Sequence, residues 1–483
     1  MRVRLLLFGS ALLASAGASP GPGHAARTAR PFDTVVLVTV DTLRADRLGV
    51  YGYHEPTSPV IDALAADSVR FERAATTCPA TAPAVASMLT GHHRAVHGVE
   101  RNTNRLRRDV VTLAEILRRA RHRTVAVVSN DVLDRRGFDQ GFERFHMAVV
   151  DPTRRALGLD VSVVKHVGRE LRRLGSEPAF LWVHFMAPHG PYRPPPGHAK
   201  LFPRWRYLRP GDVPLPLLPG NYGLGGIPRY QRLGGLRDPA HFRARYDAEV
   251  RYADTLIGMI VRRLQRAGRW DRTLLVLTAD HGESLGEHDA YFQHGWFAHQ
   301  ATVRAPLLIR APGRLPAGRV TSSVSLIDLT PTILALLGIP ARTSFEGRSL
   351  LPVIDGHTGD RPAFTQTYYA NRVDALTLGR WKYVRTSAPM ALPSGTAPRT
   401  KAGRPPAPRE ALYDLTSDPN ETTDLAAHRP DVRARLAART AAWLRGQMKR
   451  RRVLPPPPPS VQRRAAGEEE RFQDRLRALG YLD

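Results

Sequence analysis

Cysteine is almost absent from this chain of 483 residues, because Cys78 is the only one. A single cysteine cannot form an intramolecular disulfide, so stability must come from a buried core even in an oxidising compartment. Beyond the first residues there is also no apolar run long enough to cross a bilayer as a helix. The sequence therefore excludes a disulfide scaffold and predicts no integral membrane segment after the N-terminal region.

Acidic residues are scarce relative to basic ones, with 44 Asp and Glu against 71 Lys and Arg, for a net charge of +27. Such a charge attracts anionic substrates, polyanions or anionic lipid surfaces. The arginines are spread along the whole chain, and the sequence contains no nucleic-acid-binding motif, so we expect no nucleic-acid partner. A general arginine bias explains the charge better than a dedicated polyanion site.

The N-terminal residues have the pattern of a cleavable secretory signal. A basic start at residues 1–4 is followed by a short apolar stretch at residues 5–14 and by small residues. This stretch is too short to span a bilayer. We therefore expect a signal peptide and linker at residues 1–25, and a periplasmic or secreted location. The alternative is an ordinary buried helix, but Gly, Pro and His follow the stretch at once.

The remaining sequence predicts an α/β fold, with a doubly wound, mostly parallel sheet flanked by helices. Strand-length apolar runs alternate with helical patterns over residues 32–355, which we expect to form the catalytic domain. Residues 193–243 are rich in Pro, Gly and Arg and are interpreted as a surface insertion, followed by an amphipathic helix at 247–267. Residues 360–448 predict a smaller α+β subdomain with an antiparallel sheet. A Pro-rich spacer and a terminal helix account for residues 449–483.

Two of the apolar strands end in side chains that bind metals. Residues 34–40 run into Asp41, and residues 274–279 run into Asp280 and His281. If the two strands lie side by side in a parallel sheet, all three side chains meet at one edge. These ligands suit one divalent ion, either Ca, Mg, Mn or Zn.

Other residues could supply the chemistry around such an ion. Thr81 lies near the start of a helix that Pro83 marks, where the helix dipole favours an oxyanion, and a metal could activate its hydroxyl as a nucleophile. His189 and His294 could bind ester oxygens or protonate a leaving group. Each residue alone has an ordinary explanation, since a Thr before a helix is usually a cap and a strand-end Asp is often a turn residue. Their coincidence at separate strand ends favours a site.

Several stretches together make the chain resemble the sulfatase family, a branch of the alkaline-phosphatase-like superfamily. They are VTVDTLRAD (residues 38–46), TAPAVASMLTG (81–91), WVHFMAPHGPY (182–192) and TADHGE (278–283). The similarity continues through residues 304–307, 328–332, 381–383 and 412–419 in family order. The resemblance implies the fold described above, and a divalent metal held by Asp41, Thr81, Asp280 and His281. It places Thr81, His189 and His294 in catalysis, and we expect Arg44, Asn130 and Arg304 to contact an anionic ester substrate, either a glycan or a lipid-linked molecule.

The chain also departs from the family pattern. Sulfatases that form formylglycine carry a Cys/Ser-x-Pro-x-Arg motif, whereas this chain has Thr81 at the first position and Val85 at the last. Threonine cannot give formylglycine, and Thr42 stands where many sulfatases have another Asp. A Thr nucleophile resembles phosphodiesterases and phosphoethanolamine or glycerophosphate transferases of the superfamily. Three functions therefore remain open: a sulfatase-like hydrolase, a phosphoryl hydrolase or transferase on envelope glycans or lipids, and a non-catalytic protein that binds anionic glycans.

Overall fold

The computed structural model describes residues 31–134, 136–148, 160–340, 344–367, 372–386 and 410–453, with residues 470, 473, 474, 476 and 477. The predicted signal peptide at residues 1–25 lies outside the described residues, as does most of the Pro-rich spacer and terminal helix predicted at 449–483.

A central sheet of eight strands runs in the order β10-β2-β9-β6-β1-β5-β3-β4. All neighbours pair in parallel except β9, which is antiparallel to both β2 and β6. The middle strands are wholly buried and apolar, as expected for strands covered on both faces. The strands are β1 (Thr34–Val40), β2 (Val69–Ala75), β3 (Arg123–Val128), β4 (Arg144–Met147), β5 (Ala179–Phe185), β6 (Thr273–Ala279), β9 (Arg304–Arg310) and β10 (Gly318–Ser325).

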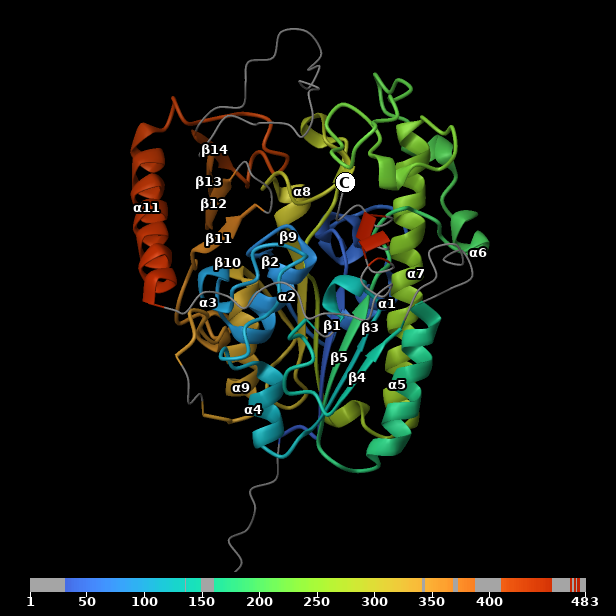
Figure 1. Ribbon diagram of the computed structural model, residues 1–483, viewed down its shortest axis with the longest axis vertical. Helices are drawn as coiled ribbons and strands as arrows, with labels where there is room; N and C mark the ends of the chain where they lie inside the picture. The colour runs from blue at the N-terminus through green and yellow to red at the C-terminus, as the bar shows by residue number, and fades with distance from the viewer. Residues whose placement is uncertain are drawn as a thin grey trace, which may run out of the picture. The chain divides into compact units, whose positions relative to one another are not determined.

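Helices cover both faces of this sheet. Figure 1 shows α1 (Pro59–Ala65), α5 (Asp160–Leu174) and α7 (Pro239–Arg266) on one face. The other face carries α2 (Thr81–Thr90), α4 (Leu113–Arg119) and α9 (Leu329–Leu336). The predicted α/β class with a mostly parallel, doubly wound sheet is therefore confirmed. None of the helices in the described ranges combines the length and apolar character that a bilayer span requires.

Local chemistry explains where the helices begin. The Thr112 and Glu115 side chains form a capping box at the start of α4. Helix α7 begins at Pro239. Its N-cap is Asp238, whose side chain accepts a hydrogen bond from the Ala240 amide. The helix predicted from 247 therefore begins about two turns earlier, and its first turn overlaps the insertion that we predicted to reach 243. The sequence pattern hides this start because the N-cap and the N-terminal proline lie inside the Arg-rich stretch.

The C-terminal part is built around a second sheet. Four antiparallel strands run in the order β11 (Ala363–Gln366), β12 (Val373–Leu378), β13 (Trp381–Thr386) and β14 (Glu410–Asp414). Helix α11 (Pro430–Val453) packs against this sheet, and Trp443 stacks on Phe364 with ring centroids 4.4 Å apart. The predicted antiparallel sheet is confirmed. The remaining short elements are α3 (Arg94–His97), α6 (Pro196–Ala199), β7 (Ser284–Leu285), β8 (Tyr291–Gln293), α8 (Gln300–Val303) and α10 (Leu351–Ile354).

Candidate active site

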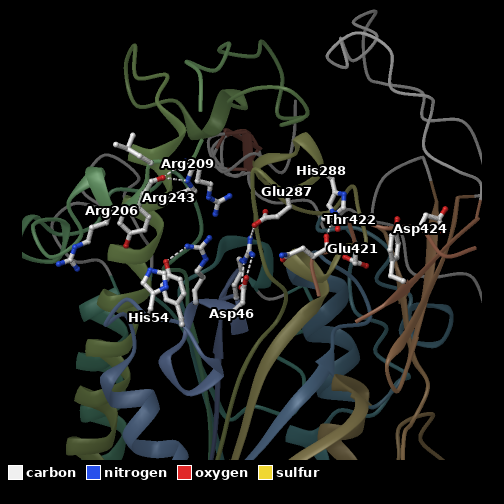
Figure 2. Close-up of a pocket in the computed structure, with 17 residues that line it drawn as sticks. Asp46, His54, Arg206, Arg209, Arg243, Glu287, His288, Glu421, Thr422 and Asp424 are labelled. Atoms are coloured by element: carbon white, nitrogen blue, oxygen red, sulfur yellow. Dashed lines mark hydrogen bonds and ion pairs between the residues drawn. The ribbon is translucent and has the colours of Figure 1, made fainter. Parts of the chain in front are cut away.

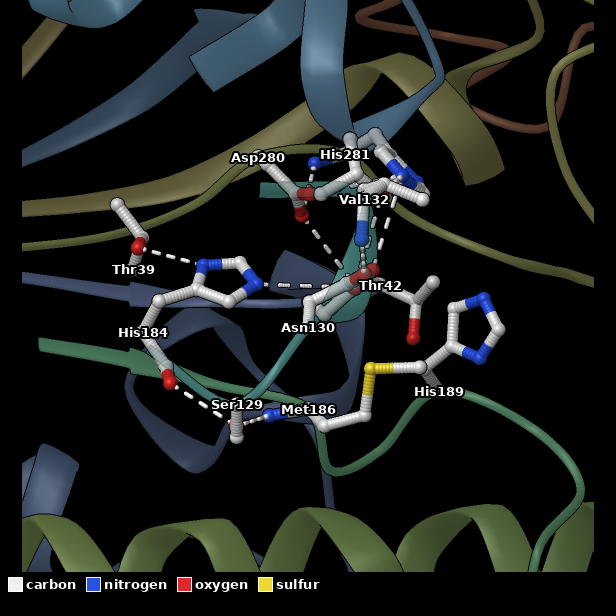
Figure 3. A network of polar contacts seen from close by, with 12 residues as sticks. Thr39, Thr42, Ser129, Asn130, Val132, His184, Met186, His189, Asp280 and His281 are labelled. Atoms are coloured by element: carbon white, nitrogen blue, oxygen red, sulfur yellow. Dashed lines mark hydrogen bonds and ion pairs between the residues drawn. The ribbon is translucent and has the colours of Figure 1, made fainter. Parts of the chain in front are cut away.

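Asp41 and Asp280 lie next to each other at the carboxyl edge of the central sheet. Strands β1 and β6 pair in parallel with Val40 opposite Ala279, so the residues that follow them are neighbours. Both carboxylates are completely buried. Ligand atoms of Asp41, Asp280 and His184 all lie within 4.8 Å of one another. The register of the two strands thus brings the two acids together as predicted. Figure 3 shows Asp280 and His281 at this edge, with His184 and Asn130.

His281 adds an imidazole nitrogen to this pair of acids. Its Nδ1 lies 2.9 Å from the Gly282 carbonyl oxygen, an acceptor, so Nδ1 carries the proton and Nε2 keeps its lone pair. That Nε2 lies 3.7 Å from Asp41 Oδ1 and 3.6 Å from Asp280 Oδ2. Two carboxylates and a nitrogen lone pair therefore converge, and all of them are acceptors.

Such a group of acceptors fits a cation. The Asp280 Oδ2 atom is buried and has no hydrogen-bond partner in the described structure. Burial, and then the neighbouring Asp41, raise the pKa of Asp280. A divalent ion held by Asp41, Asp280 and His281 would remove both costs, and oxygen with imidazole ligands suits Mg, Mn, Ca or Zn. The residues present thus fit the metal that the sequence predicts.

His184 on β5 was not predicted as a site residue, although it is completely buried beside Asp41. Trp182 Nε1 donates to Thr39 Oγ1 (3.0 Å), and this hydroxyl lies 2.8 Å from His184 Nδ1. The Thr39 hydroxyl also lies 3.5 Å from the Val183 carbonyl oxygen, so it has two acceptors within reach. His184 Nε2 is 3.7 Å from Asp41 Oδ2, beyond hydrogen-bond distance, so His184 lies beside the acids without a hydrogen bond to Asp41. Burial lowers the pKa of His184, which keeps the ring neutral.

Thr81 lies at the first position of α2, with its hydroxyl facing the acids. Its Oγ1 is 3.5 Å from Asp41 Oδ2 and 3.4 Å from His281 Nε2. Ala80 is the N-cap and no side chain caps this helix, so Thr81 is not a capping residue. Instead, Asn102 Oδ1 accepts a hydrogen bond from the Ala82 amide (2.9 Å). All ten residues of α2 are buried, which fixes the hydroxyl in place.

Two further histidines, both predicted, stand beside this cluster. The His294 ring lies 4.5 Å from the His281 ring and 5.1 Å from the His189 ring, between centroids. His294 Nδ1 is 3.2 Å from Glu283 Oε1. Burial raises the pKa of Glu283 to about 8 and lowers that of His294 to about 4. The pair is therefore neutral near pH 7, with the Glu283 proton directed at Nδ1.

The three predicted substrate contacts have different positions. Asn130 Nδ2 donates to Asp41 Oδ2 (2.5 Å), so Asn130 is part of the cluster and orients this carboxylate. Arg44 pairs with Asp46 and Glu287 and donates to the Glu283 carbonyl oxygen (2.9 Å).

Arg304 is held away from the acids by other contacts. Its guanidinium donates to the Glu72 carbonyl oxygen (2.9 Å), pairs with the Glu72 carboxylate and lies over the Tyr51 ring. Arg304 is the first residue of β9, which pairs with β2. These contacts therefore hold its side chain against residues of β2. The structure therefore does not bring Arg304 to Asp41 and Thr81.

Thr42 follows Asp41 in a strained conformation. Its φ is 56°, a left-handed value that is rare for a β-branched residue and costs about 1–3 kcal/mol. The Thr42 amide donates to Asp280 Oδ1 (3.3 Å), and its carbonyl oxygen accepts from the Tyr246 hydroxyl (2.7 Å). The strained turn thus ties the ends of β1 and β6 together.

A second group with metal-ligating side chains lies where the C-terminal part meets the segments on either side of β8. It contains His288, His299 and Glu421. The two imidazoles stack at 3.7 Å with planes 11° apart, so their in-plane lone pairs cannot point at one ion between them. The buried Lys382 ammonium lies 2.6 Å from Glu421 Oε1 and already neutralises that carboxylate. This group is therefore an ionic contact between two parts of the fold rather than a metal site.

A cavity of about 970 Å³ opens beside the site and is lined by Arg44, by the insertion and by the C-terminal part (Figure 2). Arg44 links this cavity to the candidate site. The Glu283 carbonyl oxygen accepts a hydrogen bond from Arg44, and the Glu283 side chain contacts His294. Acidic and basic side chains both line the cavity. Five of the lining residues are arginines: Arg44, Arg47, Arg206, Arg209 and Arg243.

Known proteins with similar sequences are sulfatases. The chain is 28% identical over 427 residues to a choline-sulfatase of Rhizobium meliloti (strain 1021), covering 76% of this chain and 77% of that protein. It is 31% identical over 209 residues to arylsulfatase K of Bos taurus, covering 41% of this chain and 35% of that protein. The chain thus spans about a third of the length of the arylsulfatase K relatives that it matches.

Solved structures show the same fold. The phosphonate monoester hydrolase of Agrobacterium radiobacter superposes with a TM-score of 0.67 at 22% identity, covering 86% of this chain and 96% of that one. A 2-O GAG sulfatase superposes with a TM-score of 0.66 at 20% identity, covering 88% and 94%. The family model described as Sulfatase matches residues 33–339, well over half of the chain. Sequence, fold and the arrangement of the strand ends agree, and the protein belongs to the sulfatase family.

Proposed function

We propose that the protein is a metal-dependent hydrolase of sulfate, phosphate or phosphonate esters, with Thr81 as its nucleophile. The observation that carries the proposal is the position of the Thr81 hydroxyl, 3.5 Å from Asp41 Oδ2 and 3.4 Å from His281 Nε2 on a fully buried helix. A divalent ion bound by Asp41, Asp280 and His281 would neutralise these acceptors and polarise the ester oxygens. The periplasmic or secreted location predicted from the N-terminal residues belongs to the same proposal.

The residues around Thr81 account for each proton. The Thr81 oxygen forms a bond to sulfur or phosphorus while its proton passes to Asp41 Oδ2. The bond from sulfur or phosphorus to the alcohol breaks, and the alcohol oxygen takes the proton from His294 Nε2. The Glu283 proton then moves to His294 Nδ1, which lies 3.2 Å away. In the second step water attacks the same centre and gives a proton to His294 Nε2, while the Nδ1 proton returns to Glu283 and the Thr81 oxygen takes its proton back from Asp41 as it leaves.

The identity of the nucleophile favours phosphoryl and phosphonyl esters among the candidates. A threonine ester has no aldehyde hydrate that could expel sulfate by breaking a carbon–oxygen bond, so release requires a second attack at sulfur or phosphorus. Similarity to a phosphonate monoester hydrolase supports phosphorus, whereas the names of the choline-sulfatase and arylsulfatase relatives support sulfur. Parallel assays with aryl sulfate, aryl phosphate and phenylphosphonate monoesters decide between them.

Substitution of Thr81 tests the proposal. With a divalent metal present, Thr81→Ala should lower kcat by about 10³-fold or more, as loss of a nucleophile does in other hydrolases. Thr81→Ser should retain a measurable rate because it keeps the hydroxyl. Thr90→Ala, at the other end of the same buried helix, controls for general damage to α2. Wild-type activity in Thr81→Ala, or no ester cleavage by the wild type with any divalent metal, would contradict the proposal.

A further inference from the structure

Exposed apolar side chains are concentrated in one part of the insertion. Across the described ranges, six large apolar side chains expose half of their surface or more: Leu201 (50%), Trp205 (66%), Leu208 (52%), Val213 (52%), Met448 (51%) and Val453 (79%). The first four lie within residues 201–213, which we name the apolar segment. Single exposed apolar residues are ordinary, whereas a cluster of them marks an interaction surface.

The apolar segment is anchored, so its outward side chains are held in place. Phe202 and Tyr207 are buried and pack with Ala240, Ala244 and Ala248 of α7. The Tyr207 carbonyl oxygen accepts from Arg243 Nη2 (2.8 Å). Residues 204–207 form a single 3₁₀ turn, in which side chains three apart lie on the same side. Trp205 lies within this turn and Leu208 follows it directly as the C-cap, so both residues lie close in sequence to the anchored Tyr207 of the same segment.

Positive charges surround these apolar side chains. Lys200, Arg204, Arg206 and Arg209 are all exposed. Arg204 pairs with Asp238, and Arg206 pairs with Glu55 and lies 5.3 Å from the centre of the Trp205 ring. Within the part of the chain that the structure describes, Lys200 and Arg209 form no ion pair. The nearby Asp212 is already paired with Arg243. The segment thus carries uncompensated positive charge.

We infer that the apolar segment docks the protein on the surface of an anionic lipid membrane. Leu208 is among the residues that line the cavity described above, whereas Leu201, Trp205 and Val213 are not, and exposed apolar side chains outside a groove suit a fluid interface into which they can insert. Trp prefers the headgroup region of a bilayer, and Lys and Arg beside it attract anionic lipids. None of the described helices could span a bilayer, so the contact is peripheral. This inference does not depend on the proposed reaction.

Co-sedimentation of the full chain with lipid vesicles tests the inference. We expect the wild-type protein to bind vesicles of equal parts phosphatidylglycerol and phosphatidylcholine, and to bind pure phosphatidylcholine far more weakly. The double variant Trp205→Ser/Leu208→Ser should weaken partitioning into the anionic vesicles by about tenfold or more, because two interfacial side chains are lost. The matched control is Met448→Ser/Val453→Ser, which removes two comparably exposed apolar side chains from α11.

A second pair of variants separates charge from apolar insertion. Lys200→Gln/Arg209→Gln should weaken binding to anionic vesicles by about tenfold or more, since each basic residue near the surface contributes about fivefold. Equal weakening by the two apolar double variants would overturn the inference, because the apolar segment would then contribute no more than α11 does. No weakening by Trp205→Ser/Leu208→Ser would overturn it as well, because net charge alone would then explain binding. Absence of wild-type binding to anionic vesicles would also overturn it, as would capture of the segment by a soluble anionic glycan while vesicles fail to bind. Thermal unfolding of each variant checks that the fold is intact.

Discussion

Exchange of Asp280 for asparagine should stabilise the metal-free protein and remove most of the stabilisation that a metal gives. Ligand atoms of Asp41 and Asp280 lie within 4.8 Å of each other, and both residues are buried. At an effective dielectric constant of about 20, two charges at that separation repel by about 3 kcal/mol. Burial, and then the neighbouring Asp41, raise the pKa of Asp280, so protonation relieves part of this repulsion and about 3 kcal/mol is an upper value.

Asparagine also fits the hydrogen bonds of this position. Asp280 Oδ1 accepts from the Thr42 and His281 amides, and the asparagine oxygen can accept both. The new Nδ2 takes the place of Oδ2, 3.6 Å from His281 Nε2, where a donor meets an acceptor. The metal-free variant should therefore unfold at a temperature up to about 3 °C above that of metal-free wild type, given an unfolding entropy of about 2.1 cal/mol/K per residue.

Scanning calorimetry with and without a chelator measures both effects. A metal at about 100 times its Kd should stabilise the wild type by about 2.7 kcal/mol and should hardly change the variant, which lacks a carboxylate ligand. Asp67→Asn, at an exposed acid outside the site, is the control and should leave both values unchanged. A metal-free Asp280→Asn protein that is less stable than metal-free wild type would refute the electrostatic reasoning. Equal stabilisation of both proteins by metal would refute the assignment of the ligand.

Three other changes test neighbouring features. Thr42→Asp should tighten divalent-metal binding about tenfold, since a third carboxylate is added at a left-handed position that Asp tolerates better than Thr, and titration calorimetry measures the affinity. Glu283→Gln keeps a donor for His294 but cannot pass on a proton, so kcat should fall for alkyl esters and change little for nitrophenyl esters. Burial lowers the pKa of His97 to about 3, and its Nδ1 accepts a hydrogen bond from the Val99 amide. As the pH falls, this histidine is therefore protonated in the unfolded chain before it is protonated in the folded protein. The stability that neutral His97 contributes is thus complete above pH 6.5 and is lost as the pH falls towards 3, and His97→Gln should flatten that part of a urea-unfolding profile against pH.

The meeting of Asp41, Asp280 and His281 could be predicted because local pattern and topology agree there. Each acid follows an unbroken apolar strand, and adjacent parallel strands bring their carboxyl ends to one edge. His184 could not be found in the same way, since it lies inside a strand that is buried on both faces. The sequence offers one signal for such a residue. A polar side chain inside an apolar strand must find hydrogen-bond partners in the core, so it marks a buried polar contact.

Other parts of the fold depend on contacts that the sequence does not display. Strand β2 (VRFERAA) was not predicted, because its Arg and Glu residues interrupt the apolar pattern, although these side chains pair with one another. The direction of Arg304 depends on Glu72, more than 200 residues earlier in the chain. The hydrogen bonds from Asn130 to Asp41 and from the Ala82 amide to Asn102 join loops whose paths only the folded chain defines.

The buried pair of Lys382 and Glu421 has a consequence for how the protein unfolds. Glu421 Oε2 also accepts a hydrogen bond from the Gln300 amide (2.5 Å), so one carboxylate joins the second sheet to the start of α8. If the C-terminal part unfolded first, water would solvate Lys382 and Glu421, but the Gln300 amide would lose its acceptor, a loss that costs about 1–3 kcal/mol. Both sheets should therefore melt in a single transition, and a chain cut short before residue 410 should not persist as a smaller enzyme.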